Sequence, residues 1–185
     1  WSQLHCGIKI SEKIPEISKF TETVKNVDTL VDLLGQNRLY TVFAPVNNKD
    51  TIIYKEIKKP SEMNLDFINS EYPPKALMFH QTETLFKYTP GTKGTIESVN
   101  LDEKKVIFGI RPCDAKSFDI LNPVFTKDFE DPYFNTRKKN TILVGLSCVK
   151  PGVNCFCTSF DDSPASSKSV DILLTDIGDK YYAEV

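Results

Sequence analysis

Residues 141–147 read Thr-Ile-Leu-Val-Gly-Leu-Ser, an almost unbroken apolar run of the length of one β-strand. Such runs are typical of strands that are buried on both faces, as in sheets covered by helices. A strand with one solvated face would instead alternate apolar and polar side chains. The run therefore predicts a central buried strand, and the expected fold class is α/β or α+β.

The sequence before this run supplies a partner strand and two helices. Residues 105–110 predict a strand, and Asp114 can cap a helix over about residues 115–125. A second helix is expected over residues 133–139, with its cations at the C-terminal end, where the helix dipole favours them. The resulting strand–helix–helix–strand unit, at about 104–148, fits a right-handed crossover between parallel strands.

Further periodic segments are expected to complete a mixed sheet with antiparallel hairpins. They are an amphipathic helix over residues 17–34, strands over 39–46 and 51–57 that could pair, a short helix from Pro74, strands over 84–88 and 95–99 around a turn between Gly91 and Gly94, and a C-terminal hairpin from 170–175 and 181–185.

Length and charge limit the classes of function. The 185 residues form one or two domains, and we expect a single domain over 1–185 with possible sub-lobes 1–100 and 101–185. Lys and Arg number 23 against 25 Asp and Glu, which argues against binding of nucleic acid or anionic membranes through bulk charge. No apolar run is long enough to cross a membrane, and residues 1–6 do not resemble a signal peptide. We therefore expect a cytoplasmic chain, and its start at Trp1 indicates a processed, tagged or shortened protein.

Four of the five cysteines, Cys113, Cys148, Cys155 and Cys157, lie close together in the sequence, and Cys6 stands apart. An odd number of cysteines without a secretion signal weakens the case for a disulfide framework. Clustered thiols in such a chain favour metal or redox chemistry instead.

The predicted strands give two of these thiols a common position. Cys113 lies three residues past the strand that ends at Ile110, and Cys148 directly follows the run that ends at Ser147. If the two strands are parallel neighbours, both thiols lie at the carboxyl edge of one sheet. That edge is where open α/β sheets place their ligands.

The other two thiols are expected to reach the same place. Pro151 and Gly152 can turn the chain back, and Cys155 and Cys157 would point to one side if their segment is extended. Four thiolates are the usual ligands of a 4Fe–4S cluster or of a structural zinc ion. The spacing matches neither paired C-x2-C knuckles nor the bacterial ferredoxin run. Three interpretations of the four cysteines therefore stay open: ligands of an iron–sulfur cluster, ligands of a zinc ion, and reduced thiols that bind no metal.

The neighbouring residues favour an anionic centre. Arg111 precedes Cys113 and Lys150 follows Cys148, and cations beside a cluster stabilise its negative charge and raise its potential. Phe156 could shield the site from water or belong to the core. The sequence contains no P-loop, dinucleotide fingerprint or Ser-His-Asp pattern, so flavin and nicotinamide cofactors would belong to partner proteins.

Four motifs occur in an order that resembles the iron–sulfur electron-transfer subunits typified by the β subunit of sulfhydrogenase and the corresponding iron–sulfur subunit of anaerobic sulfite reductase. The resemblance is strong over about 103–185 and weaker over 38–90. The motifs are FGIRPCDA at 108–115, DPYF at 131–134 with Arg137 and TILVGLSC at 141–148, PGVNCFCTS at 151–159, and VDILLTD at 170–176.

The resemblance implies a cytoplasmic subunit of anaerobic metabolism that is not catalytic alone. It would relay electrons between a flavin- or nicotinamide-binding partner and the catalytic subunit of a hydrogenase or sulfite reductase. The cysteines that carry over as ligands of one 4Fe–4S cluster are Cys113, Cys148, Cys155 and Cys157. Members usually continue into a ferredoxin-like module with two further cysteine sets, which this sequence does not contain, so we expect the N-terminal domain of a longer subunit. A zinc-stabilised interaction domain is the alternative.

Overall fold

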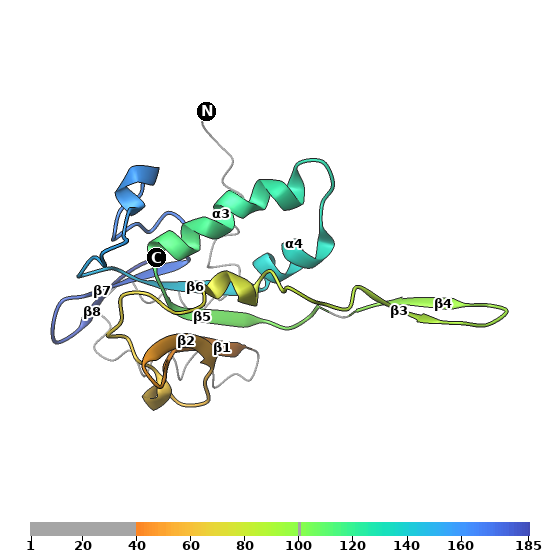
Figure 1. The fold of residues 1–185 in the computed structure, drawn as a ribbon, viewed down its shortest axis with the longest axis horizontal. Coiled ribbons are helices and arrows are strands. Elements are labelled where there is room, and N and C mark those ends of the chain that lie inside the picture. Colours follow the sequence, from red (N-terminus) through yellow and green to blue (C-terminus); the bar gives the residue numbers. More distant parts are fainter. Residues whose placement is uncertain (1–39, 100) are drawn as a thin grey trace.

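A computed structural model describes residues 40–99 and 101–185 of the chain (Figure 1). The helix expected over residues 17–34, together with Cys6, lies outside the described residues. No helix in the described part is long and apolar enough to cross a lipid bilayer.

The centre of the fold is a six-stranded mixed sheet, which confirms the expected fold class. Four neighbouring strands are parallel, and an antiparallel strand closes each edge. In spatial order the strands are β2 (Thr51–Glu56), β1 (Thr41–Asn48), β5 (Lys105–Ile110), β6 (Thr141–Leu146), β7 (Ile172–Asp176) and β8 (Tyr181–Glu184). The predicted hairpins at 39–57 and 170–185 are therefore the two edges of this sheet.

Two helices connect β5 to β6 and lie on the same side of these strands (Figure 1). They are α3 (Pro112–Thr126) and α4 (Pro132–Lys139). The Asp131 side chain caps α4 by accepting hydrogen bonds from two backbone N–H groups of the first turn. The predicted cap of α3 was wrong, because the helix already begins at Pro112. A proline fits the first helical position, where its missing N–H costs nothing, so Asp114 lies inside the first turn instead.

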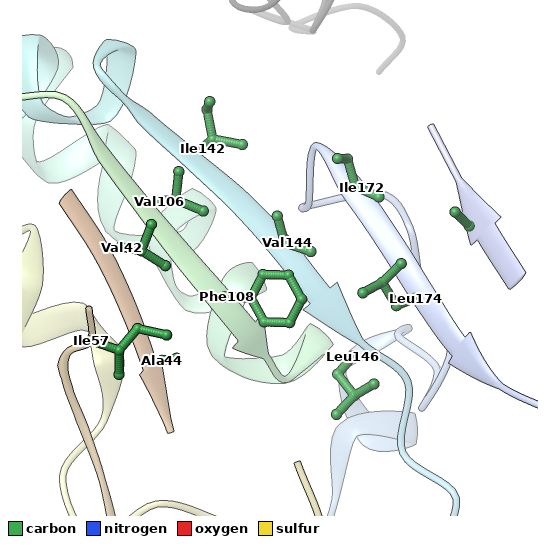
Figure 2. Packing of buried hydrophobic residues seen from close by; sticks show 11 residues of the cluster. Val42, Ala44, Ile57, Val106, Phe108, Ile142, Val144, Leu146, Ile172 and Leu174 are labelled. Carbon is green, nitrogen blue, oxygen red and sulfur yellow. The ribbon is translucent and has the colours of Figure 1, made fainter. Parts of the chain in front are cut away.

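Buried side chains form one cluster on each face of the sheet. All six residues of β5 are buried, as are five of the six in β6, which matches the prediction of strands covered on both sides. Figure 2 shows Val106 and Phe108 of β5 beside Val144 of β6 in the larger cluster. The second cluster joins the opposite face to the helices through Ile107, Ile110, Ala115, Phe118, Phe134 and Met78.

A glycine changes the direction of β5 just before the first cysteine. The register with β6 shifts between Phe108 and Ile110, and Gly109 between them has a φ of +71°. Because of this bulge, Ile107 and Ile110 face the same cluster although they are three residues apart. A Cβ on Gly109 would also stand 3.3 Å from side-chain atoms of Leu65 and Pro45. The bulge therefore requires glycine and sets the position of the chain that continues into α3.

The segments between β2 and β5 contain short elements. Residues 60–62 and 74–77 form the 3-10 helices η2 (Pro60–Glu62) and η3 (Pro74–Leu77), the second at the helix start expected from Pro74. The strands β3 (Phe86–Thr89) and β4 (Thr95–Ser98) pair with each other as a separate two-stranded sheet, as the turn between Gly91 and Gly94 predicted.

Candidate functional site

The structure places Cys113 and Cys148 at the carboxyl edge of neighbouring parallel strands. Cys113 is the second residue of α3, directly after β5, and Cys148 follows β6 by two residues. After the register shift at Gly109, the two strands remain paired at this end, where Ile110 pairs with Gly145. The predicted position of both residues is therefore confirmed.

The loop between β6 and β7 carries the other two thiols in a different conformation from the one expected. Phe156 has a ψ of 23°, and Cys157 begins the 3-10 helix η4 (Cys157–Phe160), so the segment is not extended. A tight turn holds Cys155 instead: its N–H donates to the Gly152 carbonyl at 3.1 Å, and the Gly152 N–H donates to its Sγ at 3.0 Å. The same-side argument from strand geometry therefore does not apply to this pair.

Cys148 is nevertheless close enough to the other three thiols to interact with them electrostatically, and Cys113 is also close enough to Cys157. Cys113 is an exposed residue, but partial burial of its thiol raises its pKa to about 11, and Asp114 and the thiolates of Cys148 and Cys157 contribute in the same direction. Burial also raises the pKa of Cys148, which Cys155 and Cys157 raise further. All four are free thiols. Within residues 40–99 and 101–185, no three His, Cys, Asp or Glu side chains stand close enough together to hold a metal ion.

Arg111 is a buried cation beside these thiols. Its side chain is 6% exposed, and its guanidinium lies over the Phe67 ring, with Cζ 4.3 Å from the ring centroid. The two Nη atoms donate to the carbonyl oxygens of Leu146, Ser147 and Phe67, with Nη1 2.9 Å from that of Ser147. Its Nε is buried and has no hydrogen-bond partner in the described part of the chain. Among the described residues, the guanidinium therefore hydrogen-bonds to neutral carbonyl groups only, and an anionic group nearby would compensate its charge.

Arg111 opposes the rise in the pKa of Cys148, the direction expected of a cation that favours the thiolate. The pKa of Asp114 is raised by burial, although Lys75 and Arg111 act in the opposite direction. The first turn of α3 thus places an acid and a thiol, Asp114 and Cys113, next to one buried guanidinium. Of the two cations expected to stabilise a negatively charged centre, Arg111 is therefore the one whose charge acts on a cysteine thiol, that of Cys148.

Lys150 is exposed and occupies a different position. It lines a hollow of about 880 Å³ at the carboxyl edge of the sheet, together with Arg111, Ser147 and Tyr181. Arg111 is therefore the buried cation of the site, and Lys150 is the solvent-exposed one.

Tyr54 belongs to the surroundings of the site, although nothing in the sequence indicated it. Its hydroxyl donates to the Gly109 carbonyl at 2.9 Å, and its ring meets Phe67 edge-on. Burial raises the pKa of Tyr54 strongly, and Asp114, Cys113 and Cys148 add to the rise. Only the pairing of β2 with β1, and of β1 with β5, brings this tyrosine to the bulge, so a sequence motif could not have found it.

The cysteine loop and η4 carry exposed apolar side chains. Four of them are more than half exposed: Val149, Val153, Phe156 and Phe160. Phe156 is 62% exposed, so it does not belong to the core, and its ring lies 5.5 Å from that of Phe160. The Lys116 ammonium donates to the Phe160 carbonyl and so connects η4 to α3.

The comparison with known proteins agrees with the motifs. No protein-family model matches the chain, and no solved structure matches it. Sulfhydrogenase 2 subunit beta of Pyrococcus furiosus is 32% identical to it over 144 residues, which cover 78% of this chain and 42% of the relative. The match thus spans less than half of the relative's length.

Proposed function

Because this chain is related to the sulfhydrogenase β subunits, as its motifs predicted, we propose that it is an electron-transfer module of an oxidoreductase complex. In this role it relays electrons one at a time between redox partners and transforms no substrate itself. The observation that carries the proposal is the position of two free thiols, Cys113 and Cys148, at the carboxyl edge of neighbouring parallel strands beside the buried Arg111, with the loop that carries Cys155 and Cys157 next to them.

We propose that one 4Fe–4S cluster is held by Cys113, Cys148, Cys155 and Cys157 after the cysteine loop closes, because no three of these side chains stand close enough to bind a metal ion in the described structure. Such a cluster supplies one-electron chemistry, and together with four thiolates it carries a net negative charge. The buried Arg111 would compensate that charge from the protein interior. The Gly152 N–H already donates a hydrogen bond to the Sγ atom of Cys155. Because the cysteine loop is exposed, its two thiols can close on the cluster without a change in the buried strands.

The partners in this proposal are a catalytic redox subunit and a subunit that binds flavin or nicotinamide, in a cytoplasmic complex. Val149, Val153, Phe156 and Phe160 are exposed apolar residues in and next to the cysteine loop, and the rings of Phe156 and Phe160 are in contact; grouped exposed apolar side chains commonly mark protein interfaces. A partner that covers these side chains would exclude water from the cluster and bring its own redox group to the exposed edge.

Metal analysis of anaerobically prepared protein tests the proposal. We expect about four iron and four sulfide per chain, with visible absorbance that bleaches on reduction. Replacement of Cys113 or Cys148 by Ser should abolish cluster binding, whereas Cys6→Ser, at the cysteine that belongs to none of the four motifs, should keep it. Anaerobic protein without iron and sulfide would contradict the proposal.

A structural zinc ion is the second candidate, because four free thiols are also a complete zinc ligand set. The same measurement separates the two proposals. About one zinc per chain without sulfide would identify a zinc-stabilised interaction domain.

A further inference from the structure

The strands β3 and β4, with the turn between them, form an arm over residues 86–98 that projects from the body of the molecule (Figure 1). All eight strand residues are exposed. The arm extends away from the end of the molecule that carries η4 and the start of α3 (Figure 1). A two-stranded sheet is at best marginally stable in water by itself, so a partner surface would stabilise it.

The register of the arm gives it one apolar and one polar face. Tyr88 pairs with Ile96, and Phe86 pairs with Ser98, so these four side chains share one face. Phe86, Tyr88 and Ile96 are 56%, 59% and 71% exposed, respectively. The opposite face carries the pairs Lys87 with Glu97 and Thr89 with Thr95. The arm is thus amphipathic, although the described structure covers neither face.

The base of the arm is fixed to α4. The Tyr133 hydroxyl donates to the Leu85 carbonyl, one residue before β3 begins. Two residues earlier, Glu83 forms an ion pair with Arg137, which also donates to the Met78 carbonyl at 3.1 Å. Arg137 is buried, so this anchor is part of the folded body and gives the arm a defined direction.

The size and charge of the apolar face indicate what covers it. Three large side chains, each roughly half exposed, offer on the order of 300–400 Å². A stable interface needs about 800 Å² from each partner, so pairing of two apolar faces is insufficient, whereas a groove can enclose both exposed faces of the arm. Lys87 and Glu97 lie opposite each other and neutralise the polar face, so the surface that receives the arm needs no net charge.

We propose that the arm inserts into an uncharged apolar groove on another subunit of the redox complex. This inference rests on the proposed function, which supplies that complex. The arm would hold that partner at the end of the molecule away from the thiols. The cysteine edge then stays accessible for electron exchange.

Photo-crosslinking in the complex tests this inference. The tagged chain, with benzoylphenylalanine in place of Tyr88, is expressed in its own organism and purified with its bound subunits. We expect a crosslink from position 88 to a different subunit of the complex. A crosslink to a second copy of this chain, the absence of a crosslink, or purification of the chain by itself would overturn the proposal.

A pair of matched variants adds a quantitative readout. Combined Phe86→Ser, Tyr88→Ser and Ile96→Ser should reduce the amount of co-purified partner at least tenfold, whereas Lys87→Ser with Glu97→Ser, on the polar face, should retain it. Equal retention by both variants would overturn the proposal. Iron and sulfide in the same samples report on the proposed function separately, because wild-type protein without them refutes the cluster and leaves the crosslink interpretable.

Discussion

The Arg111 guanidinium donates a hydrogen bond of 2.9 Å to the carbonyl oxygen of Ser147. Arg111 leads into Cys113, and Ser147 directly precedes Cys148, so one buried contact joins the backbones that carry two of the four thiols. The same guanidinium also donates to the Phe67 carbonyl and lies over the Phe67 ring. The end of β5, the end of β6 and the loop after η2 therefore depend on one side chain.

Arg111→Gln should destabilise the metal-free protein by about 2–3 kcal/mol, because buried carbonyl groups lose a charged donor. Denaturant unfolding measures the change. In the cluster-loaded protein the same substitution should lower the reduction potential, because a positive charge near the cluster is removed. Lys150→Gln, at the exposed cation, is the control and should alter stability little. Equal effects of the two substitutions would contradict the assigned role of Arg111.

Gly109→Ala should destabilise the protein by about 1–3 kcal/mol, because alanine is strained at positive φ. The new Cβ would also press against Pro45 and Leu65. Gly91→Ala is the matched control, since nothing lies within 4 Å of the Cβ built there and its φ is not in the positive region. Comparable unfolding midpoints for the two variants would show that the bulge does not require glycine.

In the metal-free protein, alkylation of Cys113 should be slow at pH 8 and should accelerate up to pH about 11. Burial favours the neutral thiol, and a rise in pKa from 9.0 to about 11 reduces the reactive thiolate at pH 8 about a hundredfold. Iodoacetamide labelling followed by peptide mass spectrometry measures the rate, and protein in urea gives the reference. A folded-state rate equal to that in urea would contradict the prediction.

The same shift predicts how stability depends on pH. The folded-state pKa of Cys113 lies above its ordinary value, so its contribution to stability is present below pH 9.0 and is lost as the pH rises through about 11. Cys113→Ala should remove this part of the alkaline loss of stability. Unfolding curves between pH 8 and pH about 11 compare the two proteins, and identical slopes would exclude the effect.

Cluster assembly should protect the cysteine loop from proteases and from hydrogen exchange. Residues 149–157 are largely exposed, and ligation of Cys155 and Cys157 would fix the loop against α3. Hydrogen-exchange mass spectrometry of metal-free and anaerobically reconstituted protein should show the difference there and little change in β5. Unchanged exchange in the loop, despite bound iron and sulfide, would place these two cysteines outside the ligand set.

The sequence predicted the elements whose signal is local. The apolar runs identified β5 and β6, and their parallel pairing followed from the length of the connection, so the edge that carries Cys113 and Cys148 was predictable. The division into sub-lobes 1–100 and 101–185 stays a prediction.

The features that the sequence did not reveal depend on contacts between distant segments. Tyr54 reaches the site only because β1 pairs with both β2 and β5. A single glycine in a predicted strand does not by itself indicate a bulge. The role of Gly109 is therefore seen only in the pairing register of β5 with β6. For residues 155–157, the local turn at Gly152 and the start of η4 overrode the extended conformation that the alternating cysteines suggested.

The two crossovers β5–α3–α4–β6 and β6–η4–β7 also have a consequence for biogenesis. Cys113 leaves the ribosome well before Cys157, and it acquires neighbouring thiols only when β6 has paired with β5. Parallel pairing is a non-local and therefore slow step of folding. A group held by all four thiols, as proposed above, would enter only afterwards, and its insertion would then be a late step of maturation. Until then the cell has to keep the nascent thiols reduced.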